Sequence, residues 1–223
     1  MRLVAVSDTH LYETELDPVP EGDVFVHAGD LLRKGTLEEL APVARWLQSL
    51  PHRHKIVVAG NHDWCFARDA ERARRALGEG IIYLEDGGAE IEGLRFWGSP
   101  WQPEYNGWAF NLPRGRPLEE RWALIPERTD VLVTHCPPRG FGDRAPVGGR
   151  SGCEALLGTA LRLKPALHLF GHIHQDGGIW HEGGVCFANV TTWECEREPT
   201  VIDVDPVTRA VTSVRVPPAR RGG

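Results

Sequence analysis

Side chains that bind divalent metals follow five short apolar runs of this sequence. Carboxylate oxygen, amide oxygen and neutral imidazole nitrogen are the ligands that hard and borderline divalent cations take in proteins. A single Asp-x-His match arises often by chance, whereas five such groups, each placed directly behind an apolar run, are much harder to obtain. We therefore predict a metal centre built from seven residues: Asp8, His10, Asp30, Asn61, His135, His172 and His174.

Asp30 is the residue that we expect to bridge two metal ions. Two ions about 3.5–4 Å apart need a shared ligand, and a carboxylate offers two oxygens for this where an imidazole cannot bridge. One residue separates Asp8 from His10, and one separates His172 from His174. Both members of each pair can therefore turn toward one point where the chain leaves a strand.

The elements that must position these residues are predicted from apolar periodicity. Five apolar runs end in the polar groups and read as buried strands, over residues 2–7, 23–27, 55–59, 131–134 and 166–170. Helical patterns cover residues 36–50, 66–77, 117–125 and 151–163, with Thr36 and Ser151 placed as N-caps. Two further strand pairs are indicated, at 90–92 with 94–97 around Gly93, and at 199–204 with 210–216.

The alternation of strands and helices predicts α/β architecture, with ligands bound at the carboxyl ends of the strands. The two strand pairs suggest a second, more antiparallel sheet. No linker or repeat divides the chain, so we expect one domain over residues 1–216, followed by a disordered tail at 217–223.

Composition narrows the partners and the compartment. The chain has 223 residues, is 41% hydrophobic and carries a net charge of −6, without a basic block that would follow a nucleic-acid backbone. Long nucleic acid and membrane are therefore not expected as partners, and no feature indicates an obligate protein partner. Five cysteines without paired spacing and the absence of a signal peptide predict a cytoplasmic protein without disulfides.

The motifs around the predicted ligands resemble those of the calcineurin-like metallophosphoesterase superfamily. Its five blocks match Asp8/His10, Gly29-Asp30, Gly60-Asn61-His62, His135 and Gly171-His172-Ile173-His174. The likeness is greatest to the metallophosphoesterase domain-containing group, through SDTH at 7–10, GSPWQP at 98–103, NLPRG at 111–115, GC at 152–153 and HLFGHIH at 168–174.

This resemblance implies a fold of two facing mixed sheets flanked by helices in four layers. It also implies two ligand shells, with Asp8, His10, Asp30 and His174 around one metal and Asp30, Asn61, His135 and His172 around the other. The ions are two divalent metals, from Mn²⁺, Fe²⁺/Fe³⁺, Zn²⁺ and Co²⁺, with Mn²⁺ favoured. Ligand chemistry alone leaves the choice among them open.

The same resemblance implies hydrolysis by a metal-bridging hydroxide, with His62 as the catalytic general acid. The alternative is that His62 only supports the ligands beside it. Phosphoprotein phosphatases of the superfamily orient this histidine with a second carboxylate, but Arg33 stands at that position here. Asp63 is the other residue that we consider for this orienting role.

The substrate side is predicted from an aromatic loop. Residues 97–110 hold Trp97, Trp101, Tyr105, Trp108 and Phe110 among glycines and prolines, and such rings stack a nucleobase or an aryl group. A small core beneath the loop is an equal alternative. The substrate-binding residues that we name are Trp101, Arg139 and Phe141.

The leading hypothesis is a phosphodiesterase that acts on small nucleotides, cyclic ones included, because the resembled group is associated with that activity. A broad phosphomonoesterase comes second. A non-catalytic metal-binding scaffold, as in a retromer subunit of the superfamily, and a nuclease for short single strands are further alternatives.

Other polar residues near these motifs receive structural assignments. We expect His27 and His168 to be buried and hydrogen-bonded, and His52, His54 and His181 to lie on the surface. The role of Asn189 stays open. Cys65 and Cys136 lie near the predicted ligands, where inert packing is the favoured interpretation.

Overall fold

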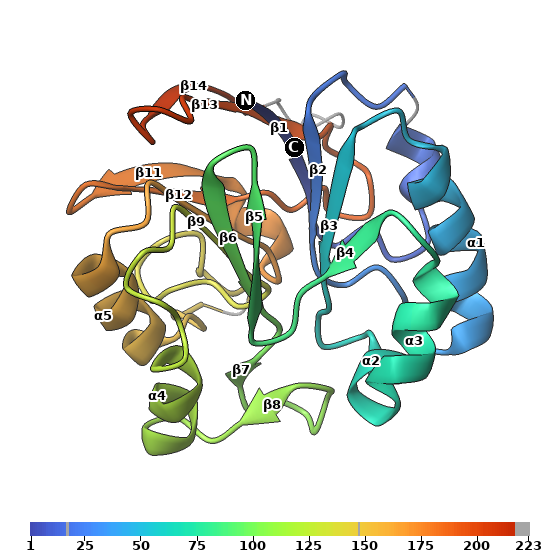
Figure 1. The fold of residues 1–223 in the computed structure, drawn as a ribbon. Helices are drawn as coiled ribbons and strands as arrows, with labels where there is room; N and C mark the ends of the chain where they lie inside the picture. The colour runs from blue at the N-terminus through green and yellow to red at the C-terminus, as the bar shows by residue number, and fades with distance from the viewer. Residues whose placement is uncertain (17, 147, 217–223) are drawn as a thin grey trace.

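The computed structural model describes residues 1–16, 18–146 and 148–216, and it consists of two facing six-stranded sheets with helices on both outer sides (Figure 1). The predicted four-layer α/β fold is confirmed. The tail predicted at 217–223 lies outside the described residues.

The first sheet joins the two ends of the chain. Its order is β14 (Val211–Arg215), β13 (Thr200–Val204), β1 (Arg2–Val6), β2 (Val24–Ala28), β3 (His54–Val58) and β4 (Ile81–Tyr83). The strands β1 to β4 run parallel, so their carboxyl ends meet at one edge, whereas β13 pairs antiparallel with β1 and with β14.

The second sheet has the same construction. Its order is β11 (Gly178–Glu182), β12 (Val185–Asn189), β10 (Leu167–Phe170), β9 (Val131–Thr134), β6 (Leu94–Ser99) and β5 (Gly87–Ile91). Only the outer strands β11 and β5 pair antiparallel, and the strands between them are parallel.

The prediction that the second sheet is more antiparallel than the first is wrong. In the described residues, each sheet has three parallel and two antiparallel pairings. The hairpin around Gly93 and the closing pair β13–β14 join different sheets. The strands β4, β11 and β12 were not predicted from the sequence.

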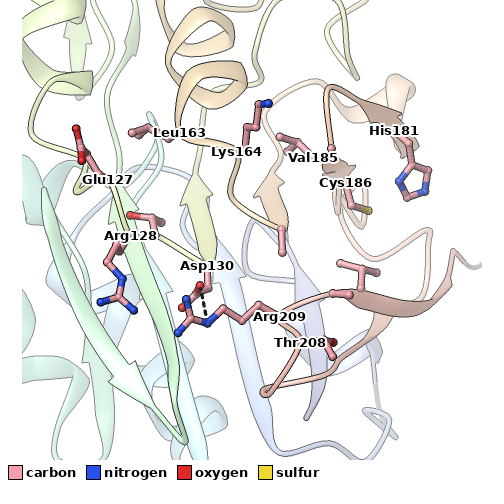
Figure 2. A pocket seen from close by; sticks show the side chains of 15 residues that line it. Glu127, Arg128, Asp130, Leu163, Lys164, His181, Val185, Cys186, Thr208 and Arg209 are labelled. Carbon is pink, nitrogen blue, oxygen red and sulfur yellow. Dashed lines mark ion pairs between the residues drawn. The ribbon is translucent and has the colours of Figure 1, made fainter.

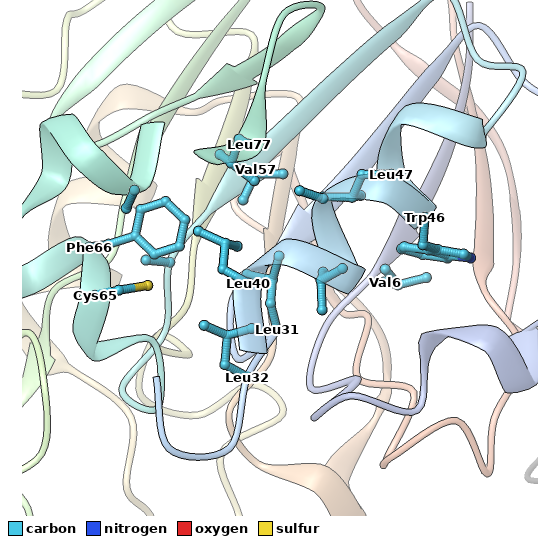
Figure 3. Close-up of a cluster of buried hydrophobic side chains, with 14 of the residues drawn as sticks. Val6, Leu31, Leu32, Leu40, Trp46, Leu47, Val57, Cys65, Phe66 and Leu77 are labelled. Carbon is cyan, nitrogen blue, oxygen red and sulfur yellow. The ribbon is translucent and has the colours of Figure 1, made fainter. Parts of the chain in front are cut away.

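Alternating side chains of the first sheet fill two separate cores. Val4, Val6 and Val57 face the helices, whereas Leu3 and Ile56 face the second sheet and pack with its apolar residues. This division follows from the two-residue period of a strand. Figure 3 shows the first of these cores, in which Leu40, Leu47, Phe66 and Leu77 from the helices cover Val6 and Val57.

The first sheet is covered by three helices: α1 (Leu37–Ser49), α2 (Trp64–Arg68) and α3 (Ala70–Leu77) (Figure 1). Thr36 caps α1, because its hydroxyl accepts from the amide of Glu39 at 3.2 Å. The single helix predicted at 66–77 is instead two helices that break at Asp69, whose carboxylate caps the second one.

The second sheet is covered by α4 (Arg116–Trp122) and α5 (Glu154–Leu163). Ser151 is not the N-cap of α5, because Cys153 occupies that position and the amide of Ser151 donates to the carbonyl of Asp143. Two 3-10 helices, η1 (Glu13–Leu16) and η2 (His174–Asp176), and a small sheet of β7 (Gln102–Pro103) with β8 (Asn111–Leu112) complete the described elements.

The histidine assignments are confirmed for His27, His168 and the exposed His181, whereas His54 is half-buried. His27 and His168 are fully buried and lie 3.0 and 2.9 Å from the hydroxyls of Thr9 and Thr134. The assignment of His52 to the surface is wrong. Its ring is buried against Phe25, and Nε2 donates to the carbonyl of Pro20 at 3.0 Å.

All five cysteines are free and buried. Burial raises the pKa of the Cys65 thiol to about 12, with a smaller contribution from the charge of Asp63, and burial also raises the pKa of Cys136 well above its usual value. These thiols are poor nucleophiles, in agreement with inert packing. The helices of the described residues include none that is long and apolar enough to cross a membrane.

The buried His168 makes a pH-dependent contribution to stability. Burial lowers the pKa of His168 to about 3, whereas the unfolded chain keeps a value of about 6.5. Below pH 6.5 the unfolded chain binds a proton at His168 that the folded protein does not bind. The free energy of unfolding therefore falls as the pH falls.

We predict that His168→Gln loses less stability than the wild type on acidification. Between pH 7 and pH 5 the difference in the free energy of unfolding should change by about 2 kcal/mol in favour of the variant. Urea denaturation of both proteins in chelator, at the two pH values, measures this. An unchanged difference would show that His168 titrates normally.

Candidate metal centre

The seven predicted ligands lie where the carboxyl ends of the parallel strands of both sheets meet. Asp8, Asp30 and Asn61 follow β1, β2 and β3 of the first sheet, and His135 and His172 follow β9 and β10 of the second. The donor atoms form clusters within 4.8 Å, made of Asp8, His10 and His174, of Asp30, His135 and His172, and of His10, Asp30 and His62.

The donor atoms of Asp8, His10 and His174, the first cluster, lie close to one another. Nε2 of His174 lies 3.5 Å from Oδ1 of Asp8 and 3.4 Å from Nε2 of His10. In the second cluster, Nε2 of His135 lies 3.0 Å from Oδ1 of Asn61, and the rings of His135 and His172 are 5.1 Å apart.

Asp30 links the two clusters, because its carboxylate lies near an imidazole of each. Its Oδ2 lies 3.7 Å from Nε2 of His10 and 3.3 Å from Nε2 of His135. Its Oδ1 accepts from the amide of His62 at 2.8 Å. One oxygen of Asp30 therefore faces His10 and His135, while the other accepts a hydrogen bond from the backbone, and Asp30 would be a ligand shared by two cations.

Backbone carbonyls orient two of the imidazoles. Nδ1 of His10 donates to the carbonyl of Leu32 at 3.0 Å, and Nδ1 of His135 donates to the carbonyl of Ala28 at 2.9 Å. A proton fixed on Nδ1 leaves Nε2 with its lone pair directed at the cluster.

Four of the predicted ligands have a left-handed backbone. The φ angles of Asp8, His10, Asp30 and His172 are 59°, 45°, 56° and 72°, a region that costs a non-glycine residue free energy. Residues with such strained backbone angles occur where the surrounding structure enforces them, and they are frequent at functional sites. The neighbouring Gly171 is required for space, because a Cβ there would clash with Ser7 Oγ and Asp8 Oδ2.

The charges of the clusters are unbalanced without cations. Burial opposes ionisation of Asp8 and Asp30, but the positive charge and contacts of His174 and His135 hold the pKa of both carboxyls below its usual value. Burial disfavours the charged form of His135 as well, yet Asp30 raises the pKa of His135 to about 9. Protons on histidine thus occupy the place that divalent cations take when they bind. The carboxylate, amide-oxygen and imidazole donors of these clusters fit a metal centre.

Asp63 joins the loops that carry Asp30 and Asn61. This fully buried carboxylate accepts from the amides of Gly60 at 2.8 Å, Leu32 at 2.9 Å and Leu31 at 3.3 Å. Burial first, and the charge of Asp30 second, raise the pKa of Asp63 to about 7. Asp63 therefore orients the two loops by their backbones, and the orienting role toward the His62 ring that we considered for it is wrong.

The His62 ring is oriented by a backbone carbonyl. Its Nδ1 donates to the carbonyl of Arg33 at 2.9 Å, and its ring packs against His10 and Trp108 at centroid distances of 4.8 and 4.4 Å. The main chain of Arg33 thus supplies the acceptor that a carboxylate side chain provides in phosphoprotein phosphatases. The guanidinium of Arg33 is engaged by the carbonyl of His10 at 3.0 Å and by Glu194 at 3.4 Å.

The three predicted substrate residues have contacts elsewhere. Trp101 donates its indole N–H to Asp86 at 2.8 Å and carries the guanidinium of Arg121 over its ring. Arg139 pairs with Glu154 at 2.9 Å, and Phe141 stacks on Phe187 at 4.5 Å between ring centroids. The aromatic residue that contacts His62 is Trp108, which the sequence placed in the same loop without distinguishing it from the others.

The loop after β12 was not recognised from the sequence. The amide of Glu194 donates to the carbonyl of Asp8 at 2.9 Å, and the amide and hydroxyl of Thr192 both donate to the carbonyl of Ser7 at 2.9 Å. Asn189, whose role was open, donates to the carbonyls of Gly142 and Ile173 at 3.0 Å each. These residues hold the loops that carry Asp8 and His174 by hydrogen bonds to their backbone. They belong to no short sequence motif that would have predicted this role.

A cavity of about 590 Å³ lies away from the metal centre (Figure 2). Its wall includes Asp130 and Ala166, which precede β9 and β10, and Arg209 in the β13–β14 turn, which pairs with Asp130 at 3.5 Å. The cavity therefore lies at the amino ends of the strands whose carboxyl ends carry His135 and His172.

The chain is similar in sequence to known phosphoesterase-family proteins. Residues 1–176 match the family model described as calcineurin-like phosphoesterase. The human metallophosphoesterase domain-containing protein 1 is 43% identical over an alignment of 198 positions, which spans 77% of this chain and 60% of the relative. The Caenorhabditis elegans UPF0046 protein T07D4.2 is 34% identical over an alignment of 237 positions, gaps included, which spans 92% of this chain and 60% of that relative. The aligned part of this chain thus spans only 60% of the length of these relatives.

Solved structures share the fold. One crystal structure aligns with a TM-score of 0.74 and 20% identity over 96% of this chain and 98% of its own. A structure titled "GAP50 the anchor in the inner membrane complex of Plasmodium" aligns with a TM-score of 0.53 and 11% identity over 99% of this chain and 89% of its own. At these identities the likeness concerns the fold alone.

We predict that Asp63→Asn destabilises the protein and weakens metal binding. Asparagine presents one oxygen and one NH₂ group where aspartate presents two oxygens, so a buried backbone N–H loses its acceptor at a cost of about 1–3 kcal/mol. Urea denaturation in chelator at pH 8 measures the first effect, and calorimetric titration with Mn²⁺ measures the second.

Asp69→Asn is the matched control for this substitution. Asp69 accepts one hydrogen bond from the exposed helix cap at Arg72, and asparagine caps a helix as well as aspartate does. Its free energy of unfolding should change by only a few tenths of a kcal/mol. Equal stability of the Asp63 and Asp69 variants would refute the role assigned to Asp63.

Proposed function

The chain belongs to the calcineurin-like phosphoesterase family, and from this premise we propose that it hydrolyses small phosphodiesters with the help of two divalent cations. The observation that carries the proposal is the position of Asp30 Oδ2, which faces an imidazole of each cluster. Two-metal hydrolysis requires a shared oxygen ligand of this kind.

The proposed ligands form two sets, which follow the Asp8–His10–His174 and Asp30–His135–His172 clusters and add Asn61 beside His135. Asp8, His10 and His174 would hold one cation, and Asn61, His135 and His172 the other, with Asp30 common to both. When bound, the cations would acidify a water and stabilise negative charge on the phosphoryl oxygens.

His62 is the residue to which we assign proton transfer. Its Nδ1 is engaged by the carbonyl of Arg33, so Nε2 is the nitrogen free to face substrate. Hydrolysis joins the oxygen of water to phosphorus and breaks the bond from phosphorus to the leaving oxygen, which keeps the electron pair. Protonated His62 gives its Nε2 proton to that oxygen, and the proton released by water returns to solvent, from which His62 is protonated again.

A diester suits the charge of this site better than a monoester. A monoester carries two negative charges near neutral pH, whereas a diester carries one. Arg33 lies beside the His10 loop, but its guanidinium is occupied by the His10 carbonyl and by Glu194. The Arg33 guanidinium is thus committed to these contacts rather than to the extra charge of a monoester, and we prefer small nucleotides, cyclic ones included, as the substrates.

We propose Mn²⁺ as the working cation and the cytoplasm as the compartment. Mixed oxygen and imidazole donors suit Mn²⁺ as well as Fe²⁺, Zn²⁺ and Co²⁺. The five free cysteines agree with a reducing compartment.

We expect His62→Ala to lower kcat by about 10²–10⁴-fold with metal content retained, since proton transfer is worth that much and the seven ligands remain. Elemental analysis and kcat are measured on the same preparation. His181→Ala, which changes an exposed histidine on β11, should keep full activity. A metal-loaded wild type without activity would instead favour a scaffold, and an active His62→Ala would remove His62 from catalysis.

Stripping the protein with a chelator should abolish turnover, and Mn²⁺ should restore it. In Mn²⁺, we expect kcat/KM for bis(p-nitrophenyl) phosphate to exceed that for p-nitrophenyl phosphate by about tenfold or more, which corresponds to about 1.4 kcal/mol of transition-state stabilisation. Both substrates release the same phenolate, so the comparison isolates the second ester group. Preferred monoester turnover would overturn the diesterase proposal.

A further inference from the structure

Residues 102–112, which comprise β7, β8 and the loop between them, are here called the aromatic flap. Hydrogen bonds within the flap fix its conformation. Its base is closed by backbone bonds from Gln102 to Phe110 at 3.0 Å and from Glu104 to Leu112 at 2.9 Å. The side chain of Asn111 accepts from Gln102 and donates to the carbonyl of Tyr105 at 2.8 Å. The tip is therefore held in place by hydrogen bonds along the flap.

The flap is joined to the loop that carries Asn61 and His62. The amide of Ala109 donates to the carbonyl of Asn61 at 3.2 Å. The ring of Trp108 lies 4.4 Å from the ring of His62, at an interplanar angle of 63°. This contact places an aromatic side chain directly beside the proposed proton donor.

The rings of the flap and of the strand before it divide into two sets. Trp97, Trp101 and Phe110 pack in the hydrophobic cores, and Trp101 also spends its indole N–H on Asp86. In contrast, Trp108 is half-buried, and Tyr105 is 61% exposed with its ring 6.1 Å from that of Trp108. The alternative of a small core beneath the loop is thus confirmed for the first set, and the stacking of a ligand ring stays a prediction for the second.

We propose that Trp108 and Tyr105 form a subsite for a flat ring carried by the leaving group of the substrate. The inference rests on the proposed function, because His62 protonates the leaving oxygen and Trp108 touches His62. A ring bound at Trp108 therefore belongs to the departing alcohol and not to the phosphoryl group that stays. The substrates assigned by this subsite are phosphoesters of aryl alcohols or of nucleosides.

Binding of non-hydrolysable ligands tests the subsite without turnover. In Mn²⁺, the wild type should bind phenylphosphonate about tenfold or more tightly than methylphosphonate, since stacking of a base on an aromatic side chain contributes at this level. Trp108→Leu and Tyr105→Leu should bring the ratio toward one, and Trp108→Phe should retain most of it. Calorimetric titration measures each dissociation constant.

Val207→Ala is the control, because Val207 is 87% exposed in the β13–β14 turn, remote from β7 and β8 (Figure 1). This variant should keep the wild-type ratio. A ratio near one in the wild type, or an unchanged ratio in both leucine variants, would overturn the subsite. Tyr105→Leu changes an exposed side chain, so the test does not depend on the folding of the Trp108 variant.

Kinetics assign the ring to the leaving side. Two methyl phosphodiesters are compared, one with 4-chlorophenyl and one with hexafluoroisopropyl as the leaving group, since these alcohols have similar acidity. Wild type should prefer the aryl ester in kcat/KM by about tenfold, and Trp108→Leu should remove this preference. An equal loss on both esters would show that Trp108 only positions His62, and it would overturn the proposal.

The two experiments separate the two proposals. If the wild type hydrolyses both esters without an aryl preference, the subsite fails and the proposed function stands. If the wild type hydrolyses neither ester, the proposed function fails and the leaving-group assignment fails with it. The phosphonate ratio then decides whether the flap binds a ring at all.

Discussion

The buried carboxylate of Asp30 is the group on which the arrangement of the two sheets at their common edge depends. Its Oδ2 lies near His10 from the first sheet and His135 from the second, and Nδ1 of His135 donates to the carbonyl of Ala28, the last residue of β2. A carboxylate in this environment is costly unless opposite charge is near. His135 of the second sheet supplies that charge, because its pKa is raised to about 9, and divalent cations would supply it in the proposed holoenzyme.

The loops around Asp30 are held mainly through the backbone. Asp63 accepts three amides from two loops, and the residues Thr192 and Glu194 attach the loop after β12 to the carbonyls of Ser7 and Asp8. Together with the left-handed conformations of four predicted ligands, this network indicates that folding stability is given up locally to fix donor positions. Strain of this kind is tolerated because the neighbouring hydrogen bonds enforce it.

Orientation of His62 by the carbonyl of Arg33 has a chemical consequence. A backbone carbonyl carries no net charge and does not titrate, so the acceptor at Nδ1 is the same at every pH. A carboxylate in that place would instead stabilise the protonated ring by its charge. The replacement of that carboxylate by Arg33 therefore changes the electrostatics around His62 while it keeps the direction of the ring.

The sequence by itself determined the α/β class, the five strands that end in polar clusters, and the residues that converge at their ends, because an apolar run and the polar residues directly behind it are local properties. The tertiary structure decided which sheet each hairpin joins, that Cys153 rather than Ser151 is the N-cap of α5, and that His52 is buried. It also decided that Asp63 binds amides while a carbonyl holds His62, and that Trp108 rather than Trp101 meets the site. These outcomes depend on loop dihedral angles and on contacts between segments far apart in the chain, which spacing along the sequence does not encode.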